Sequence, residues 1–355
     1  MMNKYALVLG SLGLCLASLT AHATKPVSDA PPVVAKASDQ PFIDQSGSSF
    51  LVFASDPQYP WTTYSDDGGD ISASGNQQLA RKLIEEQYQS IADFRNAKSE
   101  HHVPVMINGD MTAYGHGWQR DYLYTTLDRY LNGDYYFGLG NHDYGNNVDN
   151  CGSNGCARDS LFDLRDRMQH KVDSMDLDIE RTGRNETWRG SLAYSKQIGD
   201  VQLIQLNNYP NYRVNIDSSI WLEARTYDFR ISDSLDWLEK QLEQARANNR
   251  IIILNMHDSQ DWEHNAAEIQ RFKKMINDYQ VSAVFAGHLH KVNGKRSSAY
   301  HFGEVPAYLS GSASQSTYLI AQVDRAAGQL KISTVKNNNW ADMKTIDAIA
   351  LPDRG

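Results

Sequence analysis

Short apolar runs, each stopped by a polar residue, recur along this chain. Five of them are rich in aliphatic and aromatic residues and too short for helices, so we predict buried strands at 49–54, 103–107, 135–139, 251–255 and 281–286. Between them, apolar residues at helical spacing predict helices at 77–98, 118–131, 158–175, 233–248 and 268–278. Strands that alternate with helices are typical of right-handed parallel crossovers, which indicates an α/β fold.

The second half of the chain carries an additional strand pattern. Residues 191–198 and 201–207 are two strand-like runs joined at Gly199-Asp200, which predicts a hairpin and a second, more antiparallel sheet. Three further strand-like runs lie between residues 306 and 335. There is no internal repeat and no strong break within residues 50–350, so we expect one domain there.

The first 23 residues have the pattern of a secretory signal peptide, with Lys4, an apolar run over 5–19 and a small-residue cleavage site at Ala21-His22-Ala23. No later segment approaches the ~20 apolar residues of a membrane span. We therefore expect no transmembrane segment and a periplasmic or secreted protein. A lipid anchor on Cys15 is the alternative, but Leu14 is bulkier than lipoprotein processing normally accepts. Residues 24–49 hold four prolines among small and polar residues and are expected to be a leader or linker.

Composition and charge narrow the class of protein. The chain has 355 residues, 41% of them hydrophobic, which is ample for a packed core. Its net charge of -9 argues against a nucleic-acid backbone as the main partner. Cys151 and Cys156 lie five residues apart, and in an exported chain they predict a disulfide-closed loop, with a metal-binding pair as the alternative.

The polar residues at the predicted strand ends share metal-binding chemistry. They are two carboxylates, two amides and four imidazoles: Asp56, Gln58, Asp110, Asn141, His142, His257, His288 and His290. The carboxyl ends of parallel strands open into a crevice where α/β sheets bind ligands. Imidazole and carboxylate ligands suit Zn, Fe and Mn, and a carboxylate can bridge two such ions. So many ligands predict two divalent ions, which can hold a hydroxide and a phosphoryl group between them.

At these positions the chain resembles the calcineurin-like metallophosphoesterase superfamily. The resemblance rests on Asp56, Gly109-Asp110, Gly140-Asn141-His142-Asp143, His257 and Gly287-His288-Leu289-His290, which follow the family's order. It implies a four-layer α/β/β/α sandwich with a dinuclear site at the strand ends. Carried over by position, the resemblance implies that Asp110 bridges the two ions. Asp56 and His290 would then bind one ion, and Asn141, His257 and His288 would bind the other. His142 would contact the phosphate and protonate the leaving oxygen, and Asp143 is a second candidate catalytic residue.

The sequence departs from the family's pattern in two places. Gln58 replaces the usual His of the first motif, as in a subset of the family, and is a candidate ligand of weaker affinity. Ala113 and Tyr114 stand where phosphoprotein phosphatases place an Asp and an Arg. The acid that orients the proton-donating His is therefore missing from its expected position.

The resemblance implies a metal-dependent phosphoesterase that hydrolyses a phosphate ester with a metal-bridging hydroxide, and the signal-peptide pattern predicts that it is exported. The subset with Gln favours a phosphatase acting on phosphomonoesters. A phosphodiesterase acting on nucleotides or sphingomyelin-like lipids is one alternative, and a catalytically silent binding or toxin module is another. The sequence leaves the oligomeric state open.

Several other residues could contribute to the site or to the core. His116, just past Asp110, is a candidate substrate contact. Other histidines lack a motif and are expected at the surface, namely His101, His102, His264 and His301. Aromatic residues after the hairpin are expected in the core, with a substrate-facing lid as the alternative, namely Tyr209, Tyr212, Trp221 and Tyr227.

Overall fold

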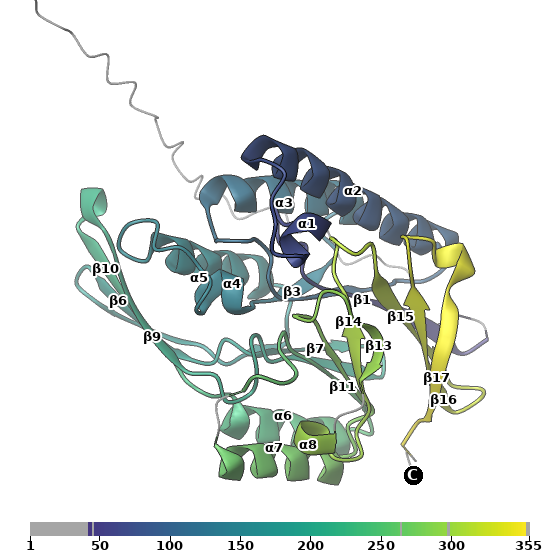
Figure 1. The fold of residues 1–355 in the computed structure, drawn as a ribbon. Coiled ribbons are helices and arrows are strands. Elements are labelled where there is room, and N and C mark those ends of the chain that lie inside the picture. The colour runs from purple at the N-terminus through teal and green to yellow at the C-terminus, as the bar shows by residue number, and fades with distance from the viewer. Residues whose placement is uncertain (1–41, 45, 263–264, 297–298, 353–355) are drawn as a thin grey trace, which may run out of the picture. The chain divides into compact units, whose positions relative to one another are not determined.

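Two β-sheets face each other at the centre of the fold (Figure 1). The computed structural model describes residues 42–44, 46–262, 265–296 and 299–352. The predicted signal peptide, and the leader up to residue 41, lie outside the described residues. No helix among the described residues is long and apolar enough to cross a membrane.

The first sheet has the order β17-β16-β15-β1-β2-β3. Its strands are β1 (Ser48–Ala54), β2 (Val105–Asn108), β3 (Tyr136–Gly138), β15 (Tyr318–Asp324), β16 (Gln329–Val335) and β17 (Lys344–Ala350). β1, β2 and β3 are parallel, as their alternation with helices predicts, and β15 adds to β1 in the antiparallel sense. β1 and β2 are buried along their whole length because the sheet is covered on both faces.

The second sheet has the order β13-β14-β12-β11-β8-β7-β4. Its strands are β4 (Ser174–Met175), β7 (Tyr194–Ile198), β8 (Val201–Gln205), β11 (Ile251–Asn255), β12 (Ala283–Ala286), β13 (Asn293–Arg296) and β14 (Ala307–Ser310). β7 and β8 form the predicted hairpin across Gly199-Asp200. β8, β11, β12 and β14 are parallel, so the sheet is mixed rather than mainly antiparallel.

Helices cover the outer faces of both sheets, which completes the four-layer α/β/β/α arrangement (Figure 1). On the first sheet lie α2 (Ala73–Ala97) and α3 (Gly117–Leu131), and on the second lie α6 (Leu235–Ala247) and α7 (Ala266–Asp278). Between the sheets, the ring of Phe53 from β1 stacks on that of Phe285 from β12, with centroids 3.6 Å apart. The apolar stripe of α6, which includes Leu238 and Leu242, is buried against the second sheet.

A third, four-stranded sheet was not predicted. It has the order β5-β6-β10-β9 and consists of β5 (Asp178–Thr182), β6 (Asn185–Gly190), β9 (Val214–Ile220) and β10 (Arg225–Ile231). Trp188 and Phe229 are buried on its inner face, against Phe162 of α5 (Gly155–Met168). The turn between β9 and β10 is the short helix η1 (Trp221–Glu223), where Trp221 is 87% exposed. The expectation that Trp221 lies in the core is wrong, because a hairpin turn has no layer above it.

Other local differences follow from capping and packing. The helix expected to reach residue 175 ends at Met168, and residues 174–175 instead pair with β7. Short helices complete the described elements: α1 (Thr63–Asp66), α4 (Asn141–Tyr144), α8 (Ala299–Phe302) and η2 (Trp340–Asp342). His101 and His301 are buried rather than exposed, because they pack on the rings of Phe50 and Trp262. His264 lies outside the described residues.

Candidate metal centre

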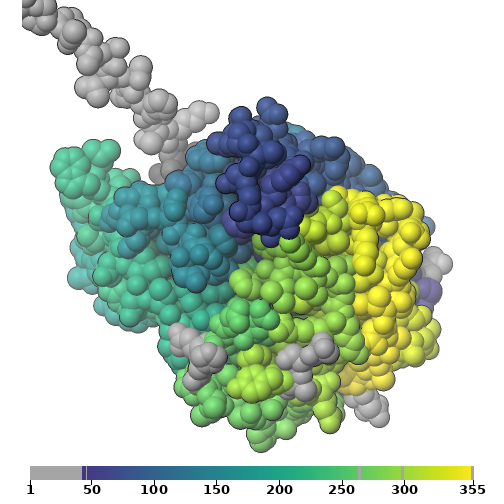
Figure 2. Space-filling model, in the orientation of Figure 1, coloured from purple at the N-terminus to yellow at the C-terminus, as the bar shows by residue number. Residues whose placement is uncertain are grey.

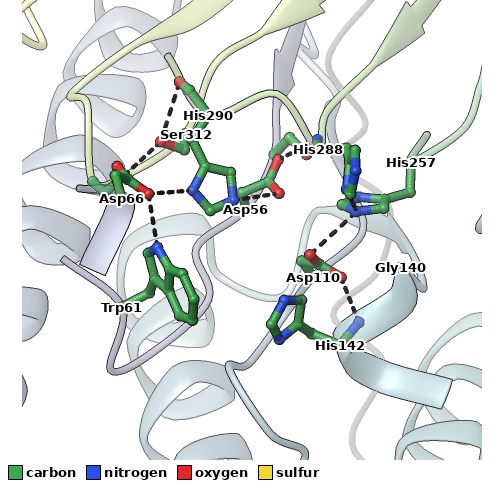
Figure 3. A network of polar contacts seen from close by, with 12 residues as sticks. Asp56, Trp61, Asp66, Asp110, Gly140, His142, His257, His288, His290 and Ser312 are labelled. Atoms are coloured by element: carbon green, nitrogen blue, oxygen red, sulfur yellow. Dashed lines mark hydrogen bonds and ion pairs between the residues drawn. The ribbon is translucent and has the colours of Figure 1, made fainter. Parts of the chain in front are cut away.

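The carboxyl ends of strands from both central sheets supply one buried cluster of polar side chains. Asp56 follows β1, Asp110 follows β2, and Asn141 follows β3 at the start of α4. From the second sheet, His257 follows β11, and His288 and His290 follow β12. Figure 3 shows these carboxylates and imidazoles converging from the two sheets. Six of the seven predicted metal ligands are therefore brought together by strand ends that are far apart in the sequence.

The backbone is held in an unusual conformation where it presents three of these side chains. Asp56, Asp110 and His288 have φ angles of 50°, 49° and 68°, in the left-handed region. A residue other than glycine pays about 1 to 2 kcal/mol for this conformation. Such strain is concentrated at functional sites, where surrounding structure enforces it. Here it turns each side chain sharply out of the strand direction and into the cluster.

The first group of ligand atoms surrounds Nε2 of His257. That nitrogen lies 3.2 Å from Oδ2 of Asp110, 3.1 Å from Oδ1 of Asn141 and 3.2 Å from Nδ1 of His288. The other ring nitrogen of His257 donates to the carbonyl oxygen of Asn108 at 2.8 Å, which fixes the ring's orientation. One imidazole nitrogen cannot bond fully to three acceptor atoms at once. A divalent cation among these atoms would be coordinated by all of them.

The second group is formed by Asp56, Asp110 and His290, whose ligand atoms lie within 4.8 Å of one another. Nε2 of His290 is 3.1 Å from Oδ1 of Asp56. Asp110, His257 and His288 form the first group by the same 4.8 Å criterion. The carboxylate of Asp110 therefore belongs to both groups, as a residue that bridges two ions must.

Glycine is required beside the ligands because the chain passes so close to them. A Cβ atom on Gly140 would lie 2.2 Å from Oδ1 of Asp110, and one on Gly287 would lie 2.5 Å from Oδ2 of Asp56. Both distances are far below any normal contact. The two glycines of the sequence motifs thus allow the backbone of α4 and the turn after β12 to approach the carboxylates.

Gln58, the seventh predicted ligand, has a buried side chain without a hydrogen-bond partner. It is 1% exposed, and neither Oε1 nor Nε2 has a partner among the described residues. Its backbone N–H donates to the carbonyl oxygen of Asp110 at 3.0 Å, so the residue lies beside the shared ligand. An unpaired buried amide costs about 1 to 3 kcal/mol, and an ion or an ion-bound water would remove that cost. The residues present therefore fit a divalent metal site.

Charges inside the cluster favour cations at the positions of the ligand atoms. Burial lowers the pKa of His257, but the charge of Asp110 more than offsets this and raises the pKa to about 10. Burial likewise lowers the pKa of His290, while Asp56 and Asp66 raise it to about 10. Burial opposes the charge of Asp110, yet the neighbouring His257 holds its pKa below the ordinary value. In the site without metal, His257 and His290 thus retain protons on nitrogens that would bind ions, whereas burial and the charge of His257 lower the pKa of His288.

His142 lies at the edge of the cluster with one ring nitrogen fixed. Its backbone N–H donates to Oδ1 of Asp110 at 2.9 Å, which ties the start of α4 to the shared carboxylate. Its Nδ1–H donates to the carbonyl oxygen of Ala113 at 2.5 Å. The side chain is half-buried. A main-chain carbonyl therefore orients the imidazole at the position where the family resemblance predicts an aspartate.

Asp143 is bound to backbone amides on all sides. Its carboxylate accepts hydrogen bonds from the N–H groups of Met111 at 3.1 Å, Thr112 at 3.4 Å and Gly140 at 2.9 Å. Burial and the nearby charge of Asp110 raise its pKa. These contacts join the loop after β2 to the loop after β3. They are therefore the contacts of a positioning residue.

Asp66 is a residue of this site that the sequence did not reveal. Its side chain is 2% exposed, and its Oδ1 accepts from Nδ1 of His290 at 2.5 Å and from Nε1 of Trp61 at 2.7 Å (Figure 3). Ser314 and Gln315 donate to its other oxygen. A carboxylate behind a histidine ligand fixes its tautomer and raises its basicity. No motif marks Asp66, since it lies in a short helix between recognisable elements.

The predicted disulfide is present between Cys151 and Cys156. Nδ1 of His116 lies 3.3 Å from Sγ of Cys151, and its Nε2 lies 2.8 Å from Oδ2 of Asp149. His116 is thus held by the side chains of Asp149 and of Cys151, at the start of the disulfide-closed loop, rather than by the carboxylates of the metal cluster.

Comparison with known proteins identifies the family. A family model for calcineurin-like phosphoesterases matches residues 51–292, a span that includes every predicted ligand. Among solved structures, 66 chains match. No curated protein matches the sequence.

Two of the solved structures match over most of this chain. A purple acid phosphatase isolated from yellow lupin (Lupinus luteus) seeds is 12% identical, with a TM-score of 0.51. The match covers 87% of this chain but only 54% of that phosphatase, so this chain corresponds to about half of the plant protein's length. GAP50, the anchor in the inner membrane complex of Plasmodium, is 10% identical, with a TM-score of 0.44 and coverage of 86% of this chain and 90% of its own.

Proposed function

This chain belongs to the calcineurin-like phosphoesterase family, and from that premise we propose that it is an exported phosphatase that hydrolyses phosphomonoesters with two divalent ions. Family membership supports the coarser part of this proposal, a hydrolase of phosphate esters that binds divalent metal. The monoester preference, the number of ions and the exported location are the parts that we add.

The observation that carries the proposal is the position of Asp110 in both groups of ligand atoms. Asp110 is shared by two groups, with Asp56 and His290 on one side and His257 and His288 on the other. A dinuclear site requires such a shared carboxylate. We assign Asp56, His290 and the nearby Gln58 to one ion, and Asn141, His257 and His288 to the other. When bound, the two ions would supply Lewis acid catalysis and would activate a water molecule for attack.

The chain's own residues would complete the reaction around the phosphorus atom. An oxygen of water forms a bond to phosphorus while the bond between phosphorus and the leaving oxygen breaks. With protons on both ring nitrogens and Nδ1–H held by the Ala113 carbonyl, His142 can give the Nε2 proton to that leaving oxygen, and the proton that the attacking water loses restores the ring for the next cycle. Asp143 would act through position alone, because its oxygens hold the two loops that carry Asp110 and His142.

Two further features support the details of the proposal. The first motif, Asp56-Pro57-Gln58, resembles that of a family subset for which phosphomonoesters are the expected substrates. The signal-peptide pattern over residues 1–23 and the disulfide between Cys151 and Cys156 both suit an oxidising compartment outside the cytoplasm.

The experiment that tests the proposal compares two ester classes on one protein. Mature protein loaded with Mn or Fe would be assayed on nitrophenyl phosphate and on bis(nitrophenyl) phosphate, with Asp110→Asn as the control for contaminating phosphatases. We expect a higher kcat/KM for the monoester. A higher value for the diester would make the protein a phosphodiesterase, and inactivity on both esters with metal bound would make it a binding module.

A further inference from the structure

An aromatic wall lines the side of the site where His142 lies. The ring of Trp61 is 5.4 Å from that of His142 and 6.0 Å from that of His290, centroid to centroid. The ring of Tyr114 lies 6.3 Å from His142 on another side and is 41% exposed. In Figure 3 the indole of Trp61 extends below Asp66, beside the imidazole of His142. Two aromatic rings therefore flank the candidate proton donor.

Trp61 is held in one orientation by a buried anion. Its Nε1–H donates to Oδ1 of Asp66 at 2.7 Å, the same oxygen that accepts from Nδ1 of His290. Its own backbone N–H donates to the carbonyl oxygen of Gln58 at 2.7 Å. The indole is thus fixed at both its backbone and its ring nitrogen, and a fixed ring offers a contact surface at little cost in side-chain entropy.

The wall continues outward to the surface of the molecule. The ring of His116 lies 6.5 Å from Tyr114 and 6.4 Å from Trp118, with which it is nearly parallel at 18°. Trp118 is 46% exposed. Figure 2 shows the segment that includes α1 at the molecular surface, between the teal segment around α4 and α5 and the yellow-green C-terminal third. Tyr114, His116 and Trp118 thus form a row of rings that runs from the candidate proton donor to side chains exposed to solvent.

The proton donor determines which part of a substrate meets this wall. If His142 protonates the leaving oxygen, the group attached to that oxygen must lie beside His142. That group is then within reach of Trp61 and Tyr114. Aromatic faces bind planar aromatic rings by stacking more favourably than they bind saturated groups of the same size.

We propose that this site selects phosphomonoesters whose leaving group carries a planar aromatic ring, and that Trp61 is the specificity-determining residue. The inference rests on the proposed phosphatase function and adds the substrate class to it. Both a nucleobase and a simple aryl group have the required chemistry, so the experiment includes one pair of substrates for each.

The test uses two pairs of substrates, in each of which one member carries a planar aromatic ring and the other does not. One pair is 2-phenylethyl phosphate and 2-cyclohexylethyl phosphate, whose leaving alcohols are alike in size and acidity. The other pair is a nucleoside 5′-monophosphate and ribose 5-phosphate. We expect the metal-loaded protein to prefer the aromatic member of at least one pair by roughly 5-fold to 150-fold in kcat/KM, the range that stacking on one aromatic side chain provides. The pair that shows the preference identifies the source of the ring.

Three variants assign the preference to Trp61. Trp61→Leu should reduce the preference to about 2-fold or less, mainly through a higher KM for the aromatic member. Trp61→Phe keeps a planar face and should retain most of the preference. Trp221→Ala, which removes a tryptophan that is 87% exposed at the β9–β10 turn, should behave like the unmodified protein. Metal content measured on each variant shows that the ligands are intact.

The possible outcomes separate this inference from the proposed function. Equal kcat/KM for both members of each pair in the unmodified protein, with clear phosphatase activity, would overturn the inference and leave the phosphatase function standing. A preference that survives Trp61→Leu would also overturn the role of Trp61. An equal loss of kcat on all substrates in Trp61→Leu would make Trp61 a positioning residue for His142. Inactivity of the unmodified protein on every monoester would remove both proposals.

Discussion

The Nδ1–H of His142 donates to the backbone carbonyl oxygen of Ala113 at a distance of 2.5 Å. The family resemblance implies an aspartate at this position, and here the main chain orients the imidazole instead. A carbonyl accepts a hydrogen bond from both the neutral and the protonated ring. The ring therefore keeps its orientation while Nε2 gains or loses the proton that the reaction needs.

His142→Ala tests that role directly. We expect metal content to stay unchanged and the rate to fall by roughly 10²-fold to 10⁴-fold on esters with poor leaving groups, the usual contribution of a general acid. Nitrophenolate leaves without a proton, so its ester should be affected much less. A rate series over leaving groups of graded acidity provides the measurement, and a uniform loss would instead assign His142 to phosphate binding.

Asp110→Asn should abolish turnover and cost the protein at least one of its ions. A neutral amide cannot bridge two dications as a carboxylate does. Elemental analysis of the purified variant, beside unmodified protein prepared in the same way, decides the matter. Two ions retained in the variant would show that Asp110 is not the bridge.

Asp66→Asn should weaken the ion bound by His290 by about 10-fold to 100-fold, the usual effect of removing a carboxylate behind a histidine ligand. The neighbouring Asp67→Asn is the matched control, because the side chain of Asp67 is 73% exposed and pairs with Lys291. Metal titration by calorimetry would measure both variants. Equal affinities in the two variants would mean that Asp66 does not support the ligand.

Gln58→His restores the histidine that the family's first motif usually has at this position, and so tests whether Gln58 weakens one metal site. An amide oxygen is a weaker ligand than imidazole for borderline ions, so the unmodified protein should hold one ion tightly and one loosely. Activity should then rise when Mn or Mg is added after dialysis, and Gln58→His should reduce that dependence. Calorimetric titration of both forms with metal would measure the affinity of each site. Two equally tight sites, unchanged by the substitution, would place Gln58 outside the coordination sphere.

Metal binding should release protons at pH 8. In the metal-free protein the pKa values of His257 and His290 are raised to about 10, so both imidazoles carry an extra proton below that pH. Ions bind the neutral imidazole, so each ligand must lose that proton, and the apparent affinity should fall as the pH falls. Titrations in two buffers of different ionisation enthalpy count the protons released. A count of zero would contradict the charge state that the geometry implies.

The grouping of the candidate ligands at the strand ends was predictable because one sequence pattern marks both the strands and the polar residues that follow them. A buried strand needs a continuous apolar run, and Asp56, Asp110 and His257 each stop such a run at its carboxyl end. The geometry of parallel sheets then brings those ends to one edge. Fold and ligand positions therefore follow from the same pattern.

Other parts of the site carry no such signal. Asp66 contacts Ser314 and Gln315 across most of the sequence, and nothing in the local pattern marks it as buried. The Ala113 carbonyl cannot be read from a sequence, because every residue has one. The third sheet was missed for a related reason: β5 is exposed or half-buried at every position, so its residues show little apolar alternation.

The unpaired amide of Gln58 and the crowded nitrogen of His257 connect metal binding to the stability of the folded chain. Unfolding would expose both groups to water, whereas folding without ions leaves them buried without a full set of hydrogen bonds. An ion that binds the folded chain alone shifts the folding equilibrium toward it, by an amount that grows with the ion's concentration relative to its dissociation constant. We therefore expect the supply of divalent ions where the chain folds to raise the share of folded, protease-resistant chain, before any substrate is met.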